Sequence, residues 1–176
     1  MTEPARMIAV VQGAPSADIQ VLFRSLADRW RSSVRLAGVI AEDHGLPDRA
    51  CAAGYLVSLA DGERFRIFQD LGPGAKGCHL APAGALAAAA AVQSDVAAGC
   101  DLVMLSKFGQ LEKNGRGLRD AFTSAIEAGI PVLTSVSPTY MAAWESYAAP
   151  LSVTIPPDPE QIDVWWQSVR PACART

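Results

Sequence analysis

The fold of this chain is decided by residues 101–136, DLVMLSKFGQLEKNGRGLRDAFTSAIEAGIPVLTSV. The stretch opens on the apolar run DLVML and closes on the apolar run VLTSV, and continuous runs of this kind are typical of strands buried on both faces. Between them, apolar residues recur at helical spacing over 118–126, and Gly129 and Pro131 then stop the pattern. This order of strand, helix and strand predicts a mainly parallel sheet with helices packed against it.

The same alternation of strands and helices extends to both sides of this stretch. Apolar runs predict further strands at 7–11, 34–40 and 151–155. Apolar residues at helical spacing predict helices over 19–30, 82–98, 141–147 and 162–169.

One pair of strands departs from this alternation. Residues 55–59 and 65–68 flank Asp61-Gly62, a dipeptide favoured in hairpin turns, so these strands are expected to be antiparallel. We therefore predict a single α/β domain over residues 1–176, with three layers, a mainly parallel sheet, helices on both faces and a β-hairpin insertion.

Composition excludes several classes of protein. The chain has 176 residues, of which 50% are hydrophobic and 19% charged, enough apolar material for a real core. Its 15 basic and 18 acidic residues give a net charge of -3 without a basic run, which argues against nucleic-acid binding. No apolar run is long enough for a membrane span, and the N-terminus lacks the basic region of a signal peptide, so we expect a cytoplasmic protein. The four cysteines form no CxxC pair and predict neither disulfides nor a thiolate zinc site.

The loops after the strands are the places to look for chemistry, because an open parallel sheet binds ligands at the carboxyl ends of its strands. The first loop, QGAPSADIQ, stands where a phosphate-binding loop would stand. The GxxxxGK[ST] pattern needs glycine and lysine where this chain has Asp18 and Ile19. This loop is therefore expected to bind triphosphates poorly, and a tight structural turn is the alternative interpretation.

A glycine-rich loop, GPGAKGC at residues 72–78, is the second candidate. Gly72, Gly74 and Gly77 allow backbone amides to converge on an anion, and Lys76 adds a full positive charge. The alternative is a surface connection between the hairpin and the next helix.

The third candidate is the loop SKFGQLEKNGRGLRD, residues 106–120. A Walker-type ATPase places an acid at the end of the preceding strand to hold Mg²⁺, but here Ser106 and Lys107 occupy that end. Lysine cannot ligate a metal and can bind an anion, so no metal site is predicted. The alternative is that Lys107 only pairs with Glu112 across a solvated turn. Further candidates for anion binding in this loop are Gly109, Arg116 and Arg119.

Three segments resemble the bacterial family called domain of unknown function 2478: RIFQDLGPGAKGCHL (66–80), the stretch 101–136 and IPPDPEQIDVWW (155–166). The similarity runs over about residues 7–166 and includes the glycine-rich loop and the KFG..E..G.G.R motif (107–119) intact. The family is often encoded near molybdate-uptake genes, which implies a role in molybdenum handling.

The layout is also distantly similar to the thermophilic-type nucleoside-triphosphatases of the P-loop superfamily, whose strand-end motif has the form DEIG.ME. The segment SKFGQLE keeps Gly109 and Glu112 of that motif and lacks both of its acids. The resemblance implies a P-loop NTPase-like fold with degenerate Walker motifs, and the lost acids argue against hydrolysis.

Three functions remain open at this point. The preferred one is an accessory or regulatory protein that binds an anion, either a molybdate-like oxyanion or a nucleotide phosphate, through Lys76, Lys107 and the glycine-rich loop. The first alternative is a divergent nucleoside-triphosphatase in which Lys76 supplies the phosphate lysine and Glu112 orients the attacking water. The second is a homo-oligomer, or a partner of a transporter or cofactor-insertion enzyme, that docks through the aromatic C-terminal helices containing Trp144, Tyr147, Trp165 and Trp166.

Overall fold

The computed structural model describes residues 6–47, 53–69 and 81–170. Within these ranges the strands form one seven-stranded sheet in the order β4-β3-β2-β5-β6-β1-β7. Strands β2, β5, β6, β1 and β7 run parallel, and β3 and β4 are antiparallel to their neighbours. The strand bounds are β1 Ile8–Val11, β2 Leu36–Asp43, β3 Ala53–Ser58, β4 Arg64–Arg66, β5 Leu102–Leu105, β6 Val132–Ser135 and β7 Ser152–Ile155. The predicted α/β class and the hairpin insertion are confirmed.

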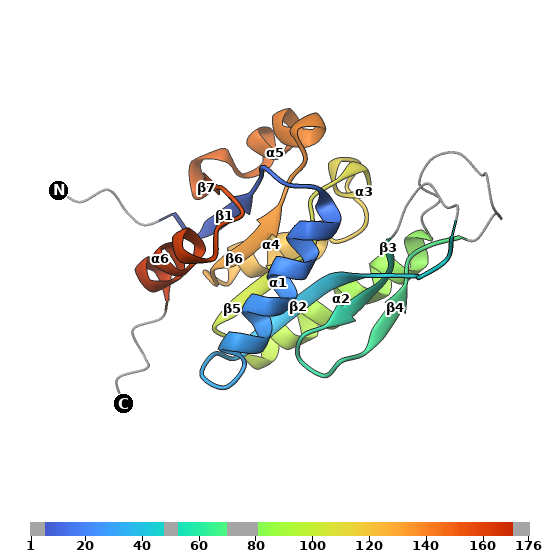
Figure 1. Ribbon diagram of the computed structural model, residues 1–176, viewed down its shortest axis with the longest axis horizontal. Helices are drawn as coiled ribbons and strands as arrows, with labels where there is room; N and C mark the ends of the chain where they lie inside the picture. Colours follow the sequence, from blue (N-terminus) through green and yellow to red (C-terminus); the bar gives the residue numbers. More distant parts are fainter. Residues whose placement is uncertain (1–5, 48–52, 70–80, 171–176) are drawn as a thin grey trace.

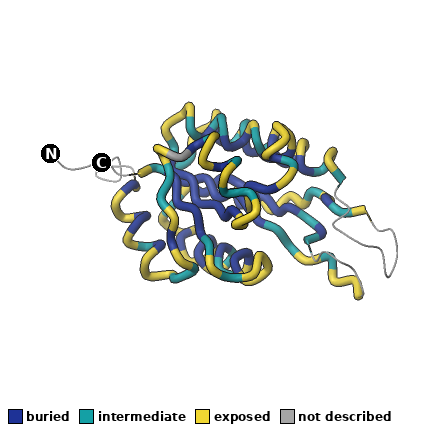
Figure 2. Tube along the Cα trace, turned by 90° about the horizontal axis from the view of Figure 1, so that it is seen from above, coloured by how far each residue is buried: buried dark blue, intermediate teal, exposed yellow. Residues whose placement is uncertain are grey.

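Helices cover both faces of the sheet (Figure 1). One core joins the sheet to α1 and α6, and a second core on the opposite face joins it to α2, α4 and α5. The helix bounds are α1 Ser16–Trp30, α2 Pro82–Ala98, α3 Gln110–Lys113, α4 Arg119–Glu127, α5 Met141–Ala148 and α6 Pro159–Val169. Figure 2 shows the trace from above, with buried residues gathered in the middle of the molecule and exposed residues around it. Within the described ranges, every helix is too short or too polar to cross a membrane.

The aromatic residues of the C-terminal helices belong to these cores. Trp144 is fully buried in α5, and Trp165 and Trp166 of α6 are only 6% and 4% exposed. The Trp166 ring packs against Trp30 of α1, with ring centroids 5.9 Å apart. These tryptophans therefore contribute their apolar area to the core of the chain itself. Docking of a partner through the C-terminal helices stays a prediction.

Thr134 in β6 gives a test of the core. Its side chain is fully buried, and its hydroxyl oxygen is the one buried side-chain polar atom in the described ranges without a hydrogen-bond partner. Burying an unpaired hydroxyl is unfavourable, so Thr134→Val is expected to raise the free energy of unfolding by about 1 kcal/mol in urea denaturation. Ser135→Ala is the control, because the Ser135 hydroxyl does donate to the Ser106 carbonyl (2.8 Å) and its removal should destabilise. A Thr134→Val protein less stable than the wild type would contradict this account.

Candidate functional site

A cavity of about 250 Å³ lies at the carboxyl edge of the sheet. The loops that follow β1, β5 and β6 line it, together with residues of β3 and of the start of α2. Parallel strands bring the loops after their carboxyl ends to the same edge, so the topology itself assembles this cavity. Within the described ranges, no cluster of three acidic, histidine or cysteine side chains is placed to hold a metal ion.

The segment after β5 lines the cavity with consecutive residues, from Ser106 to Glu112. Ser106 is buried, and its carbonyl accepts hydrogen bonds from the Gln20 side chain (2.9 Å) and the Ser135 hydroxyl (2.8 Å). Lys107 follows it, is exposed and lines the cavity. Among the described residues that line the cavity, Lys107 is the one with a positive charge. The strand that would deliver a magnesium-binding acid in a Walker ATPase therefore delivers a cation here.

Glu112 closes the loop that follows Lys107. The side chain is 5% exposed, and its two carboxylate oxygens accept the backbone N–H groups of Gly109 and Leu118, each at 2.9 Å. Burial raises the pKa of Glu112, and the N–H donors and the nearby Lys107 charge offset this only in part. Among the described residues, no ion pair joins the Glu112 carboxylate to Lys107. The alternative interpretation of Lys107, that it only pairs with Glu112, is therefore wrong.

Gly117 makes room for this carboxylate. Its φ is +59°, and a Cβ atom placed on it would lie 1.9 Å from Oε2 of Glu112. Only glycine satisfies both conditions, because other residues resist positive φ and contribute a Cβ atom. Gly117 and Glu112 of the KFG..E..G.G.R motif thus form one structural unit, which fixes the loop beside the cavity.

The arginines of the same loop point elsewhere. The Arg119 guanidinium lies 4.0 Å from the centre of the Tyr147 ring and donates to the Glu112 carbonyl at 2.8 Å. Arg116 is exposed, and neither arginine is among the residues that line the cavity. Of the anion-binding candidates in this loop, the structure brings Lys107 and Gly109 to the cavity, and the Gly109 N–H is already engaged by Glu112.

The loop after β1 also reaches the cavity, through Gly13 and Ser16. Helix α1 begins at Ser16 without a side-chain cap, so the N–H groups of its first turn have no partner of that kind. Gln12 fixes the loop by donating from its side chain to the Val136 carbonyl (2.6 Å) beyond β6. This arrangement is compatible with both interpretations of the loop, a tight turn and a contributor to anion binding.

The glycine-rich loop with Gly72, Gly74, Lys76 and Gly77 lies outside the described residues, as do Cys78 and His79. Ala81, which follows this stretch, lines the cavity. The role of Lys76 therefore stays a prediction.

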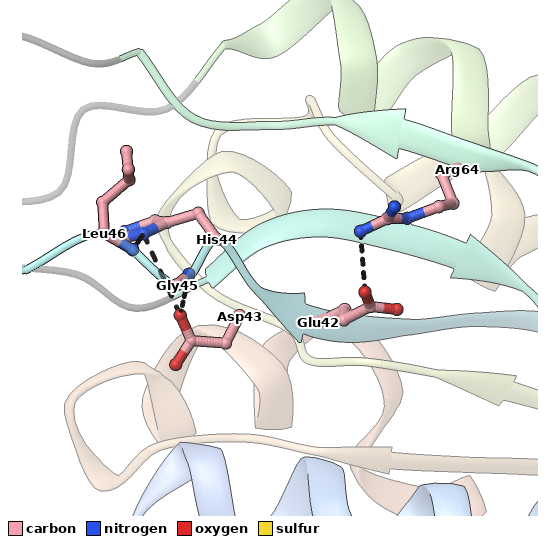
Figure 3. A network of polar contacts seen from close by, with 6 residues as sticks. All are labelled: Glu42, Asp43, His44, Gly45, Leu46 and Arg64. Atoms are coloured by element: carbon pink, nitrogen blue, oxygen red, sulfur yellow. Dashed lines mark hydrogen bonds and ion pairs between the residues drawn. The ribbon is translucent and has the colours of Figure 1, made fainter.

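His44, which follows β2, contacts neighbouring residues of its own turn (Figure 3). Its side chain is buried, its Nδ1 atom accepts the Leu46 N–H at 2.9 Å, and its ring packs against Phe68 with centroids 4.8 Å apart. Arg64 of β4 forms an ion pair with Glu42 of β2 at 2.7 Å, across the strand β3 that lies between them. The Asp43 carboxylate lies 3.9 Å from the same Nδ1 atom. These contacts within the turn indicate a structural role for His44.

Two features of the site escaped the sequence reasoning. Gln20 is buried on the apolar face of α1, and its side chain bridges Ser106 and the Ala41 N–H (2.8 Å), which ties the ends of β5 and β2 together. A polar residue at a buried helical position was the available signal. The apolar side of the cavity, formed by Leu56, Ile67 and Ala85, had no signal, because these residues look like ordinary core.

The sequence over residues 8–165 matches the family described as "Protein of unknown function (DUF2478)", and the chain belongs to this family. It is also 35% identical over 168 residues to the "Molybdenum import ATP-binding protein ModC 2" of Bradyrhizobium diazoefficiens. That alignment covers 94% of this chain and 18% of the relative, so the chain spans less than a fifth of the curated protein.

Among solved structures, the fold is similar to that of a human cancer-related nucleoside triphosphatase determined in solution. The TM-score is 0.53 at 15% sequence identity, and the match covers 98% of both chains. The likeness shows that this chain has a fold similar to that of a nucleoside triphosphatase. In its sequence, Asp18 and Ile19 stand where the GxxxxGK[ST] pattern would need glycine and lysine, and Ser106 and Lys107 follow β5.

Proposed function

We propose that this protein binds an anion at the carboxyl edge of its sheet and acts as an accessory or regulatory component in molybdenum handling. The observation that carries the proposal is Lys107, an exposed cation at the end of a buried strand that lines the cavity. Charge-assisted hydrogen bonds from such an ammonium group to an oxyanion are among the stronger polar contacts available to a protein.

The contacts of Glu112 favour binding over hydrolysis. Among the described residues, Glu112 is the one acidic residue that lines the cavity. Both oxygens of Glu112 are taken up by backbone N–H groups, and burial raises its pKa. An attacking water would have to compete for this carboxylate inside the loop. The alternative, a divergent nucleoside-triphosphatase that uses Lys76 and Glu112, requires Glu112 to leave that arrangement.

The molybdenum part of the proposal is supported by the relative. A protein named as a molybdenum import ATP-binding protein contains a region 35% identical to this chain. A domain that works beside such an importer could bind one of two anions: the imported oxyanion or the nucleotide. The two anion classes, a molybdate-like oxyanion and a nucleotide phosphate, are both within the proposal.

Calorimetric titration of the Lys107→Met protein tests it. Molybdate, inorganic phosphate, AMP and ATP, with and without Mg²⁺, are the probes, and the affinity for any probe that binds should fall by about 10- to 100-fold. Lys113→Met is the matched control, because Lys113 is an exposed lysine of α3 that does not line the cavity. Equal affinity in the wild type and the Lys107→Met protein, or no binding of any probe, would overturn the proposal.

A phosphate-release assay separates the alternative. ATP or GTP turnover near the lower end for enzymes, about 1 s⁻¹, that is lost in Lys76→Ala would favour the nucleoside-triphosphatase. A separate prediction is that Lys76 and Lys107 act on the same bound anion. The loss of binding free energy in the double Lys→Met variant should then differ from the sum of the losses in the two single variants.

A further inference from the structure

We infer that the ligand is an organic anion, with its charged group at Lys107 and a flat apolar body against the wall of Leu56, Ile67 and Ala85. This inference rests on the proposed function and chooses between the two classes of anion that it leaves open. It is carried by the composition, the volume and the charge of the cavity.

The wall of the cavity is apolar. Leu56 of β3, Ile67 after β4 and Ala85 of α2 line the cavity with apolar side chains, and Leu111 and Leu118 continue this surface from the third loop. A bare oxyanion is strongly hydrated and loses water contacts beside such a wall without replacement. An apolar ring placed there gains from the burial of both surfaces. The wall therefore favours a ligand that has an apolar part.

The volume is the second step. The cavity holds about 250 Å³. One water molecule occupies about 30 Å³ in the liquid, and a tetrahedral oxyanion needs on the order of two or three such volumes. Most of the cavity would stay filled with water around a bare oxyanion, whereas a single ring system with one acidic group fits the space.

The charge is the third step. Among the described residues that line the cavity, Lys107 is balanced by no free carboxylate, because Glu112 is committed to the backbone of its own loop. One cation and no magnesium-binding acid suit a phosphate monoester or a carboxylate better than a magnesium triphosphate. The hydroxyl groups of Ser16 and Ser137 line the same cavity and are available as polar contacts to such a group.

The experiment compares probes that differ only in the apolar body. Phenyl phosphate and AMP are titrated beside inorganic phosphate and molybdate, and the organic probes are expected to bind at least about tenfold more tightly. Ala85→Leu fills the apolar end of the cavity and should weaken phenyl phosphate and AMP by about tenfold or more, with little effect on inorganic phosphate. Ala87→Leu adds the same side chain on the exposed face of the same helix and should change nothing.

A second variant keeps the test decisive if Ala85→Leu does not fold. Leu111→Gln places an amide on the half-buried part of the wall and should weaken the same two probes selectively. Inorganic phosphate or molybdate binding as tightly as phenyl phosphate, with no effect of either wall variant, would overturn the inference and leave anion binding intact. Failure of all four probes, or indifference of binding to Lys107→Met, would instead overturn the proposed function.

Discussion

Replacement of Gly117 by alanine is expected to lower the free energy of unfolding by about 3 kcal/mol, from the combined cost of positive φ and of steric overlap. The alanine Cβ would lie 1.9 Å from Oε2 of Glu112, and the backbone would keep a φ of +59°. The carboxylate has to move, and the hydrogen bond it accepts from Leu118 is then lost. Urea denaturation of the wild type and the variant measures the difference.

Gly115→Ala is the matched control for this prediction. Gly115 also has positive φ (+77°), but nothing lies within 4 Å of a Cβ placed on it. Its replacement should cost only the conformational part, about 1 kcal/mol. Equal losses at the two glycines would show that the contact with Glu112 contributes nothing. A clearly larger loss at Gly117 would assign the excess to the displaced carboxylate.

Substitution of Glu112 by glutamine is expected to lower stability by about 2 kcal/mol at neutral pH. The glutamine oxygen can accept one of the two N–H groups, but its amide nitrogen has no lone pair for the other. A donor would then face the N–H of either Gly109 or Leu118 inside the loop, and that N–H would be left unpaired. Glu127→Gln, an exposed position at the end of α4, is the control and should leave stability within about 0.5 kcal/mol of the wild type.

The same carboxylate predicts a pH dependence. Because the pKa of Glu112 is raised in the folded protein, the folded state holds its proton more tightly than the unfolded chain. The stability linked to this group is present below its ordinary pKa of 4.5 and is lost as the pH rises through the higher folded value. A protonated carboxyl keeps a lone pair on each oxygen, so both N–H groups can still be accepted. The Glu112→Gln protein should lack this slope, and an identical pH profile in both proteins would contradict the assignment.

Much of the fold could be predicted from local patterns. The apolar runs marked the parallel strands because a strand covered on both faces has no polar side, and Asp61-Gly62 marked the hairpin because its turn favours positive φ. The four-residue helix α3 was missed, since Gln110–Lys113 is too short to show a period. The end of the strand before Ser106 and Lys107 was also placed correctly.

The directions of side chains within the third loop could not be predicted. Arg116, Arg119 and Glu112 are close in sequence to Lys107, and proximity alone suggested one shared site. In the structure Arg119 begins α4 and lies over Tyr147 of α5, a residue 28 positions further along the chain. Glu112 turns back onto its own backbone because Gly117 leaves the space. Both outcomes depend on tertiary neighbours that no local spacing reveals.

The position of β1 has a consequence for synthesis on the ribosome. This strand is the first of the described strands in sequence order, yet both of its neighbours in the sheet, β6 and β7, come from residues 132–155. During translation the apolar segment Ile8–Val11 has to wait, without a partner for its backbone groups, until most of the chain has emerged. Such an unpaired strand is open to contacts with other chains. The nascent chain therefore passes through a period in which β1 has no strand partner, and release of a chain cut short before β7 would leave β1 paired on one side only.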